Sequence, residues 1–153
     1  MYASVDAPAW EIPIVRAASW DVVRDKVATQ RRSTIRLRTS LFEEAARIVE
    51  HEYADELSLD DIARRVASSR RQLQRAFAEV GRTTFREHLA KVRMTRAAEL
   101  LAQGGLAVRD VAHRVGYRQP AQFAKAFRRH HGVAPSEFRA RRVHRAVGAP
   151  LAA

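Results

Sequence analysis

The sequence predicts an all-α protein, and two observations carry that prediction. From Leu41 almost to Arg142, apolar residues recur at spacings of three and four, the period of helices that bury one face. No segment alternates apolar and polar residues for long, and no Asn-Gly or Asp-Gly pair marks a hairpin turn. Because half-buried strands and hairpins need those signals, we expect helices rather than a sheet.

Residues 1–40 are predicted to be an N-terminal extension that is too short for an independent domain. Pro8 and Pro13 favour an extended stretch between them. Ser19 is a candidate N-cap for a short helix with one apolar face, formed by Trp20, Val23 and Val27. The segment 30–38 is basic and is interpreted as a linker. The first helix of the folded domain is therefore expected to begin at Leu41 and to carry Phe42, Ala45, Ile48, Val49 and Tyr53 on its apolar side.

An internal repeat organises the rest of the chain. Residues 57–66 align with residues 106–115, forty-nine positions later; after a one-residue insertion, Leu73 matches Phe123 and Phe77 matches Phe127. Gly81 and Gly132 close the two copies. Each copy predicts two short helices with a tight turn between them: Leu59–Val66 and Arg70–Val80, then Val108–Val115 and Pro120–His130. This is the pattern of a helix-turn-helix unit, repeated once.

The helix starts in the first copy carry capping signals. Ser58 is followed three residues later by Asp61, whose carboxylate is expected to reach back to the cap amide. Ser69 and Gln72 repeat the same spacing at the next helix. These two pairs place the helix starts at the expected positions.

The turns of the two copies differ in one residue. Gly116 permits a sharp turn in the second copy, and Pro120 suits the first position of the helix that follows. The first copy has Ala67 in place of the glycine, which weakens its match to the pattern.

A long helix, 84–103, is predicted between the copies, with a length of about 30 Å. At 100° per residue, Phe85, Leu89 and Val92 fall on one side of it. On the opposite side lie Met94, Ala98 and Leu101. A helix with two opposed apolar faces must pack against two bodies, so we expect a rigid connection between two subdomains.

Charge is distributed unevenly along the chain. The formal net charge is +11 and the pI is near 11.3. From Ile62 onward there are twenty Lys or Arg residues against five acids, whereas eight acids lie between Glu43 and Asp61. A generally basic proteome would explain the pI but not this asymmetry. A polyanion is the usual partner of such a surface, and together with helix-turn-helix units it indicates double-stranded DNA.

In a helix-turn-helix unit the second helix enters the major groove. If Leu73, Phe77 and Val80 face the core, the opposite face presents Arg71, Gln74 and Arg75, which suit guanine and adenine edges. In the second copy, core positions at Phe123 and Phe127 turn another group outward. The expected base contacts there are Gln122 and Lys125, with Ala121 nearby and Gln119 at the helix entrance. This second face is poorer in long polar groups, so we expect weaker readout from it.

Phosphate contacts are expected from arginines at the edges of the two recognition helices. These candidates are Arg70, Arg82, Arg118 and Arg128. Such contacts fix register and supply salt-sensitive affinity without reading sequence.

Three dispersed motifs resemble AraC/XylS-type transcriptional regulators: residues 69–77, 93–101 and 111–117. The pattern continues through Phe123, Phe127, Gly132 and Pro135 to Phe138 and Arg139. The resemblance covers Leu57 to Arg139 and implies seven helices in two helix-turn-helix subdomains. The corresponding boundaries are 41–145 for the DNA-binding domain, 41–82 and 106–142 for its subdomains, and 146–153 for a disordered tail.

The resemblance also implies how the protein works. Both recognition helices would enter successive major grooves of a promoter as a monomer, and members often activate transcription by contacting RNA polymerase. The family's reading positions fall on Arg71, Gln74 and Arg75, and then on Gln122 and Lys125 with Ala121 nearby. Ala121 and Lys125 stand where the family often has serine and arginine, which leaves the second half-site preference open. Most relatives carry a separate sensor domain, so this chain is either a short stand-alone member or one domain of a longer ligand-sensing regulator.

Other functional classes are disfavoured. The absence of cysteine excludes disulfides, thiolate catalysis, Cys-ligated zinc and the alkyl transfer of related DNA-repair proteins. His113, His130 and His131 lack the spacing of a metal site and are expected to be solvated, so no enzyme activity, metal or cofactor is expected. A nucleoid-type or RNA-binding protein that reads no sequence remains an alternative. No membrane span or secretion signal is recognisable, so a bacterial cytoplasmic, nucleoid-associated location is expected.

Overall fold

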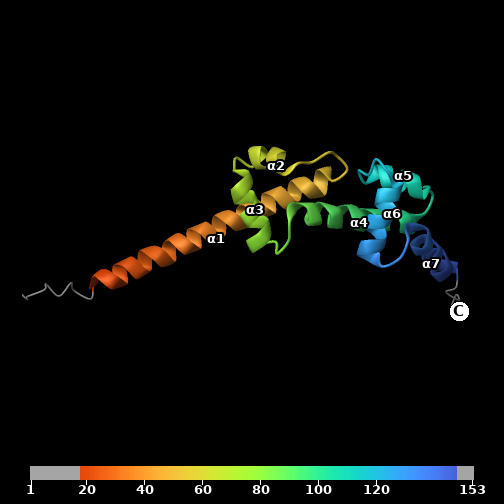
Figure 1. The fold of residues 1–153 in the computed structure, drawn as a ribbon. Helices are drawn as coiled ribbons and strands as arrows, with labels where there is room; N and C mark the ends of the chain where they lie inside the picture. The colour runs from red at the N-terminus through yellow and green to blue at the C-terminus, as the bar shows by residue number, and fades with distance from the viewer. Residues whose placement is uncertain (1–17, 148–153) are drawn as a thin grey trace, which may run out of the picture. The chain divides into compact units, whose positions relative to one another are not determined.

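The computed structural model describes residues 18–147, and the side chains of residues 22–141. These residues form seven α-helices and no strand, which confirms the predicted fold class (Figure 1). The helices are α1 (Ala18–Glu52), α2 (Leu59–Arg65), α3 (Arg70–Glu79), α4 (Phe85–Gln103), α5 (Val108–Arg114), α6 (Pro120–His131) and α7 (Pro135–Val147). The chain divides into two units, residues 1–36 and 37–153, and the second contains α2 to α7.

A helix is present where the short helix was predicted, but it does not end there, because α1 is one continuous helix of 35 residues. The predicted basic linker over residues 30–38 and the helix start at Leu41 are therefore wrong. The hydroxyls of Ser33 and Thr34 donate to the carbonyl of Gln30, at 2.8 and 2.9 Å, so these residues satisfy their polar groups inside the helix. From residue 14 to residue 80 the sequence has no glycine or proline to interrupt a helix. The expected extended stretch between the two early prolines lies outside the described residues.

The end of the chain also differs from expectation. α7 continues to Val147, so residues 146 and 147 belong to a helix and not to a tail. Residues 148–153 lie outside the described part of the chain. Both errors have the same origin, because charged and small residues without a breaker are compatible with helix as well as with linker.

The first subdomain has its own apolar core. Phe77 of α3 is 1% exposed, and its ring meets the rings of Phe42 and Phe85 edge-on at centroid distances of 5.3 and 5.8 Å. Fully buried Leu73 and Ile62 belong to the same cluster. The amphipathic pattern therefore identified the inward faces of α1, α2 and α3 correctly.

Capping at the first subdomain is as predicted at α3 and different at α2. Ser69 and Gln72 form the reciprocal capping box at the start of α3. At α2 the Ser58 hydroxyl accepts from the amide of Asp61 at 3.1 Å, but the Asp61 carboxylate takes the hydroxyl proton of Ser58 and not the cap amide. Hydrogen bonding to Ser58 lowers the pKa of Asp61.

The second subdomain repeats the plan around two phenylalanines. Phe123 and Phe127 are completely buried, as predicted, together with Val111 of α5 and Val115, the residue that follows α5. One histidine expected to be solvated is instead partly buried. The ring of His131 lies 4.4 Å from that of Phe127, and its Nε2 is 3.2 Å from the carbonyl oxygen of Met94.

Both cores share α4. Phe85, Leu89 and Val92 pack in the first cluster. Residues one or two turns later pack in the second, namely Met94, Ala97, Ala98, Leu100 and Leu101. The two opposed apolar faces derived from the helical period are therefore both used.

The turn after α2 and the turn after α5 have equivalent backbone hydrogen bonds. Ser68 N donates to the Ala63 carbonyl at 2.8 Å, and Tyr117 N donates to the Ala112 carbonyl at 2.9 Å. The residues before them, Ala67 and Gly116, have φ values of +49° and +83°. Alanine thus adopts the left-handed conformation that the second copy assigns to glycine, at a cost of roughly 1–2 kcal/mol.

We expect Ala67→Gly to raise the unfolding free energy by about 1 kcal/mol, because it relieves that strain. Gly116→Ala should lower it by about 3 kcal/mol or more, since an added Cβ would lie 2.6 Å from the Ala54 carbonyl oxygen. Urea denaturation measures both. The interpretation fails if the two substitutions change stability in the same direction.

Acid should destabilise the protein through His88. Its Nε2 is buried without a hydrogen-bond partner, and its ring lies against those of Phe42 and Phe77. Burial lowers the pKa of His88 below 6.5, with Glu50 opposing and Lys91 reinforcing the shift. The unfolded chain then binds more protons, so this contribution is present above pH 6.5 and is lost as pH falls from that value through the lower pKa of the folded state.

The measurement is the slope of unfolding free energy against pH on the acid side of 6.5. His88→Gln should flatten that slope, whatever its effect on absolute stability. An unchanged slope would assign the acid sensitivity to other groups.

Candidate nucleic-acid interface

The recognition helix of the first subdomain, α3, begins at its capping box and buries one side. Leu73, Ala76 and Phe77 are 0–1% exposed. The predicted base contacts Arg71, Gln74 and Arg75 are all exposed on the other side. One turn of helix therefore presents two guanidinium groups and one amide, a donor set that matches the major-groove edges of guanine and adenine.

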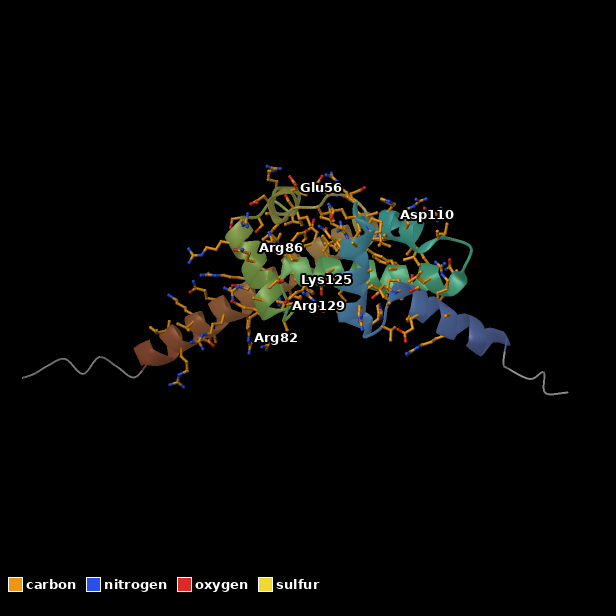
Figure 2. All side chains as sticks on the ribbon, turned by 45° about the vertical axis from the view of Figure 1, so that its right-hand side comes forward. Glu56, Arg82, Arg86, Asp110, Lys125 and Arg129 are labelled. Atoms are coloured by element: carbon orange, nitrogen blue, oxygen red, sulfur yellow. The ribbon has the colours of Figure 1, made fainter. Side chains whose placement is uncertain are left out.

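The recognition helix of the second subdomain, α6, has the same architecture with fewer long polar groups. Gln119, Ala121, Gln122 and Lys125 are exposed, as predicted. Lys125 and Arg129 lie on α6 near one another (Figure 2). Gln119 makes no side-chain cap bond to α6, so its amide is not committed to the helix start.

The four predicted phosphate-contacting arginines divide into two pairs. Arg82 and Arg128 are exposed, and Arg82 follows α3 with φ of +51°. Arg70 and Arg118 are instead held by carboxylates. Arg70 Nη1 lies 2.5 Å from Asp60 Oδ2, and Arg118 Nη2 lies 2.8 Å from Glu56 Oε2.

Each of the two subdomains has an open cleft that is lined by predicted site residues. One, of about 580 Å³, is lined by Arg118 and Gln122 of the second subdomain. The other, of about 670 Å³, is lined by Arg70 and Gln74 of the first. Leu57 and Leu89 line both clefts, so predicted site residues from both copies surround adjoining hollows of one unit.

Sequence reasoning missed the role of Arg93. Its Nε donates to the carbonyl of Tyr53 at 2.7 Å and its Nη2 to that of Asp55 at 2.9 Å. Its guanidinium carbon lies 5.5 Å from the centre of the Tyr117 ring. Burial lowers the pKa of Arg93 and raises that of Tyr117. This arginine ties the end of α1 to the turn of the second helix-turn-helix unit.

Arg86 was also missed, since a single arginine on a long helix gives no signal in the sequence. It is exposed near the start of α4 and lines the same cleft as Arg70 and Gln74 (Figure 2). The cleft at the first subdomain therefore has two arginines, Arg70 and Arg86, beside the predicted base contact Gln74.

The carboxylates of Glu56 and Asp60 lie where DNA is expected. Both side chains of the Glu56–Arg118 pair are 85% exposed, so water competes strongly with the pair and it contributes little to folding. If Arg118 contacts a phosphate as predicted, the pair would instead affect DNA binding, because it holds the cation that the phosphate needs. Glu56, before α2, and Asp60, within α2, would then compete with DNA for two of the arginines predicted to contact phosphates.

We expect Glu56→Gln to raise affinity for duplexes of any sequence by about two- to fivefold, as an exposed ion pair is worth about 0.2–1 kcal/mol. Fluorescence anisotropy at low salt measures this. Glu137→Gln is the matched control, because it makes the same charge change but pairs with Arg141 within α7. If both variants gain affinity equally, the effect comes from net charge and not from the Glu56–Arg118 pair.

Comparisons with known proteins agree with this geometry. A family model described as a helix-turn-helix domain matches residues 62–141. A transcriptional regulator with an AraC-type DNA-binding domain from Chromobacterium violaceum is 30% identical with a TM-score of 0.65; the match covers 72% of this chain and 96% of that one. The DNA-binding domain of the global transcriptional factor AdpA, solved with a target DNA, is 30% identical with a TM-score of 0.62, over 71% and 95% of the two chains.

Curated relatives are longer. The Msm operon regulatory protein of Streptococcus mutans is 31% identical over 93 residues, which are 61% of this chain and 34% of that protein. The lactose operon transcription activator of Staphylococcus xylosus is 30% identical over 87 residues, 57% of this chain and 31% of its own length. The chain spans about a third of the length of these relatives.

Two helix-turn-helix units with exposed polar recognition faces define the class of DNA-binding transcriptional regulators. Within that class, the chain belongs to the AraC-type family. Its two helix pairs, α2 with α3 and α5 with α6, lie where the repeat predicted them.

No helix among the described residues is long and apolar enough to cross a membrane. No group of three or more His, Cys, Asp or Glu side chains in this part of the chain is placed to hold a metal ion.

Proposed function

We propose that the chain binds promoter DNA sequence-specifically, with α3 and α6 in successive major grooves. The observation that carries the proposal is the exposed trio Arg71, Gln74 and Arg75 opposite a fully buried face of α3. The 30% identity to the AdpA domain that was solved with its target DNA supports the same mode of binding. Catalysis has no part in the proposal.

The recognition helices α3 and α6 are expected to contribute unequally to base readout. Arginine makes a bidentate contact with guanine and glutamine with adenine, so Gln74 and Arg75 are assigned base readout, with Arg71 beside them. On α6, Gln122 and Lys125 supply two polar contacts, and Ala121 can meet a thymine methyl group. The first half-site therefore sets specificity, and the second mainly adds affinity.

Binding requires one molecule, because both units share α4 and belong to one body. The proposed outcome is transcriptional activation through RNA polymerase in the bacterial cytoplasm. The similarity to the lactose operon transcription activator of Staphylococcus xylosus supports activation rather than repression.

Selection of bound duplexes from a random pool tests the proposal. We expect a non-palindromic site with two conserved blocks about one helical turn, or about 10 base pairs, apart. A pool that yields no consensus at physiological salt would identify a non-specific DNA-binding protein instead. A palindromic site would contradict the monomer.

Arg75→Ala should weaken binding to the selected site by about 1–3 kcal/mol and relax base preference at one position. Competition titrations against single-base variants of the site measure both effects. An equal loss on random duplex would make Arg75 a phosphate contact.

Arg128→Ala should weaken all duplexes alike, because its expected partner is a phosphate. The slope of log affinity against log salt should fall by about 0.9. Arg141→Ala, on α7, serves as the comparison for lost charge outside the recognition helices. If the two variants give the same slope, Arg128 lies outside the footprint.

A further inference from the structure

Large apolar side chains are exposed in the first part of α1. Val22, Val23 and Val27 are 53%, 51% and 43% exposed, and Ile35 is 60% exposed. At 100° per residue Val23 and Val27 fall on one side of the helix and form a short valine row, whereas Val22 and Ile35 fall to either side of it. This segment, residues 22–36, belongs to the smaller unit of the chain.

The spacing along this segment is that of a helix that pairs with another helix. Val23, Val27, Gln30 and Thr34 follow one another at intervals of four, three and four, the a and d positions of a heptad. Val27 and Thr34 hold the a positions, where β-branched residues suit a two-stranded arrangement. The polar Gln30 is the kind of residue that fixes register in a helix pair.

The charge of the segment selects the partner. It carries five basic residues and one acid: Arg24, Lys26, Arg31, Arg32, Arg36 and Asp25. Arg31 borders the valine row on one side, and Lys26 borders it on the other. A second copy of the segment would bring these cations against their equivalents, which disfavours self-association.

We propose that residues 22–36 form a docking surface for an acidic amphipathic helix of another protein. The valine row takes the apolar seam of that helix, and the flanking Arg31 and Lys26 pair with its carboxylates. DNA fits this surface less well, because phosphates gain nothing from exposed valines. A lipid surface would bury Gln30 without a partner, whereas a facing helix can hydrogen-bond to it.

The test uses the whole chain and a fluorescent three-heptad peptide with Leu at a and d and Glu at e and g. We expect anisotropy titrations to show binding that weakens as salt rises from about 50 to about 500 mM. The same peptide with Lys in place of Glu should not bind. Equal binding of both peptides would overturn the charge argument.

Val27→Glu should reduce affinity for the acidic peptide more than about tenfold, because it places a charge in the seam. Thr29→Glu is the matched control, since it makes the same charge change on the side away from the valine row. Circular dichroism and duplex binding should be unchanged in both variants, so the outcome is independent of the DNA-binding proposal.

Three results would refute the docking surface as assigned. These are equal effects of the two substitutions, a dimer in sedimentation that Val27→Glu dissociates, and preferential binding to vesicles that contain anionic phosphatidylglycerol. The second would identify another copy as the occupant, and the third a membrane.

Discussion

The two apolar faces of α4 are the constraint on which the DNA-binding unit depends. Phe85 and Leu89 complete the first core, and Met94 and Leu101 complete the second, within a single helix of 19 residues. Each helix-turn-helix unit has two short helices of its own, and α1 or α7 covers part of its phenylalanines. The connecting helix α4 supplies apolar side chains to both cores. The recognition helices therefore belong to one body, and a single molecule carries both reading faces.

The link between the subdomains is strengthened by contacts that no periodic pattern describes. Arg93 leaves the surface of α4 to bond two carbonyls at the end of α1, and Gly116 leaves room for this approach. A half-buried guanidinium costs some desolvation, which two carbonyl acceptors and the face of Tyr117 offset. The second unit needs glycine at its turn for space as well as for backbone conformation, while the first unit accommodates Ala67.

Electrostatics in this protein work by competition as well as by attraction. An excess of basic residues draws the molecule to a polyanion, yet Glu56 and Asp60 hold two of the arginines best placed for phosphates. These pairs are exposed, so DNA can displace the carboxylates at small cost. The proposed effect of these pairs is to lower the affinity for duplexes of every sequence alike.

Much of the fold was determined by the sequence alone, because helical periodicity, a repeat and capping residues are local signals. They identified the helices of both units, the buried positions Leu73, Phe77, Phe123 and Phe127, and the two-sided use of α4. They also placed the candidate base contacts on exposed faces, since a residue opposite a buried stripe must face water. Where local signals were ambiguous, in the basic segment 30–38, a linker was predicted and a helix was found.

Only the tertiary structure decided which distant groups meet. The contact of Arg93 with the end of α1, the carboxylates that hold Arg70 and Arg118, and the packing of His131 against Phe127 join residues 4 to 62 positions apart. Except at the shortest spacing, nothing in the neighbouring sequence marks these partners. They depend on how two cores orient their surfaces, and that orientation is fixed by packing on α4 rather than by any local preference.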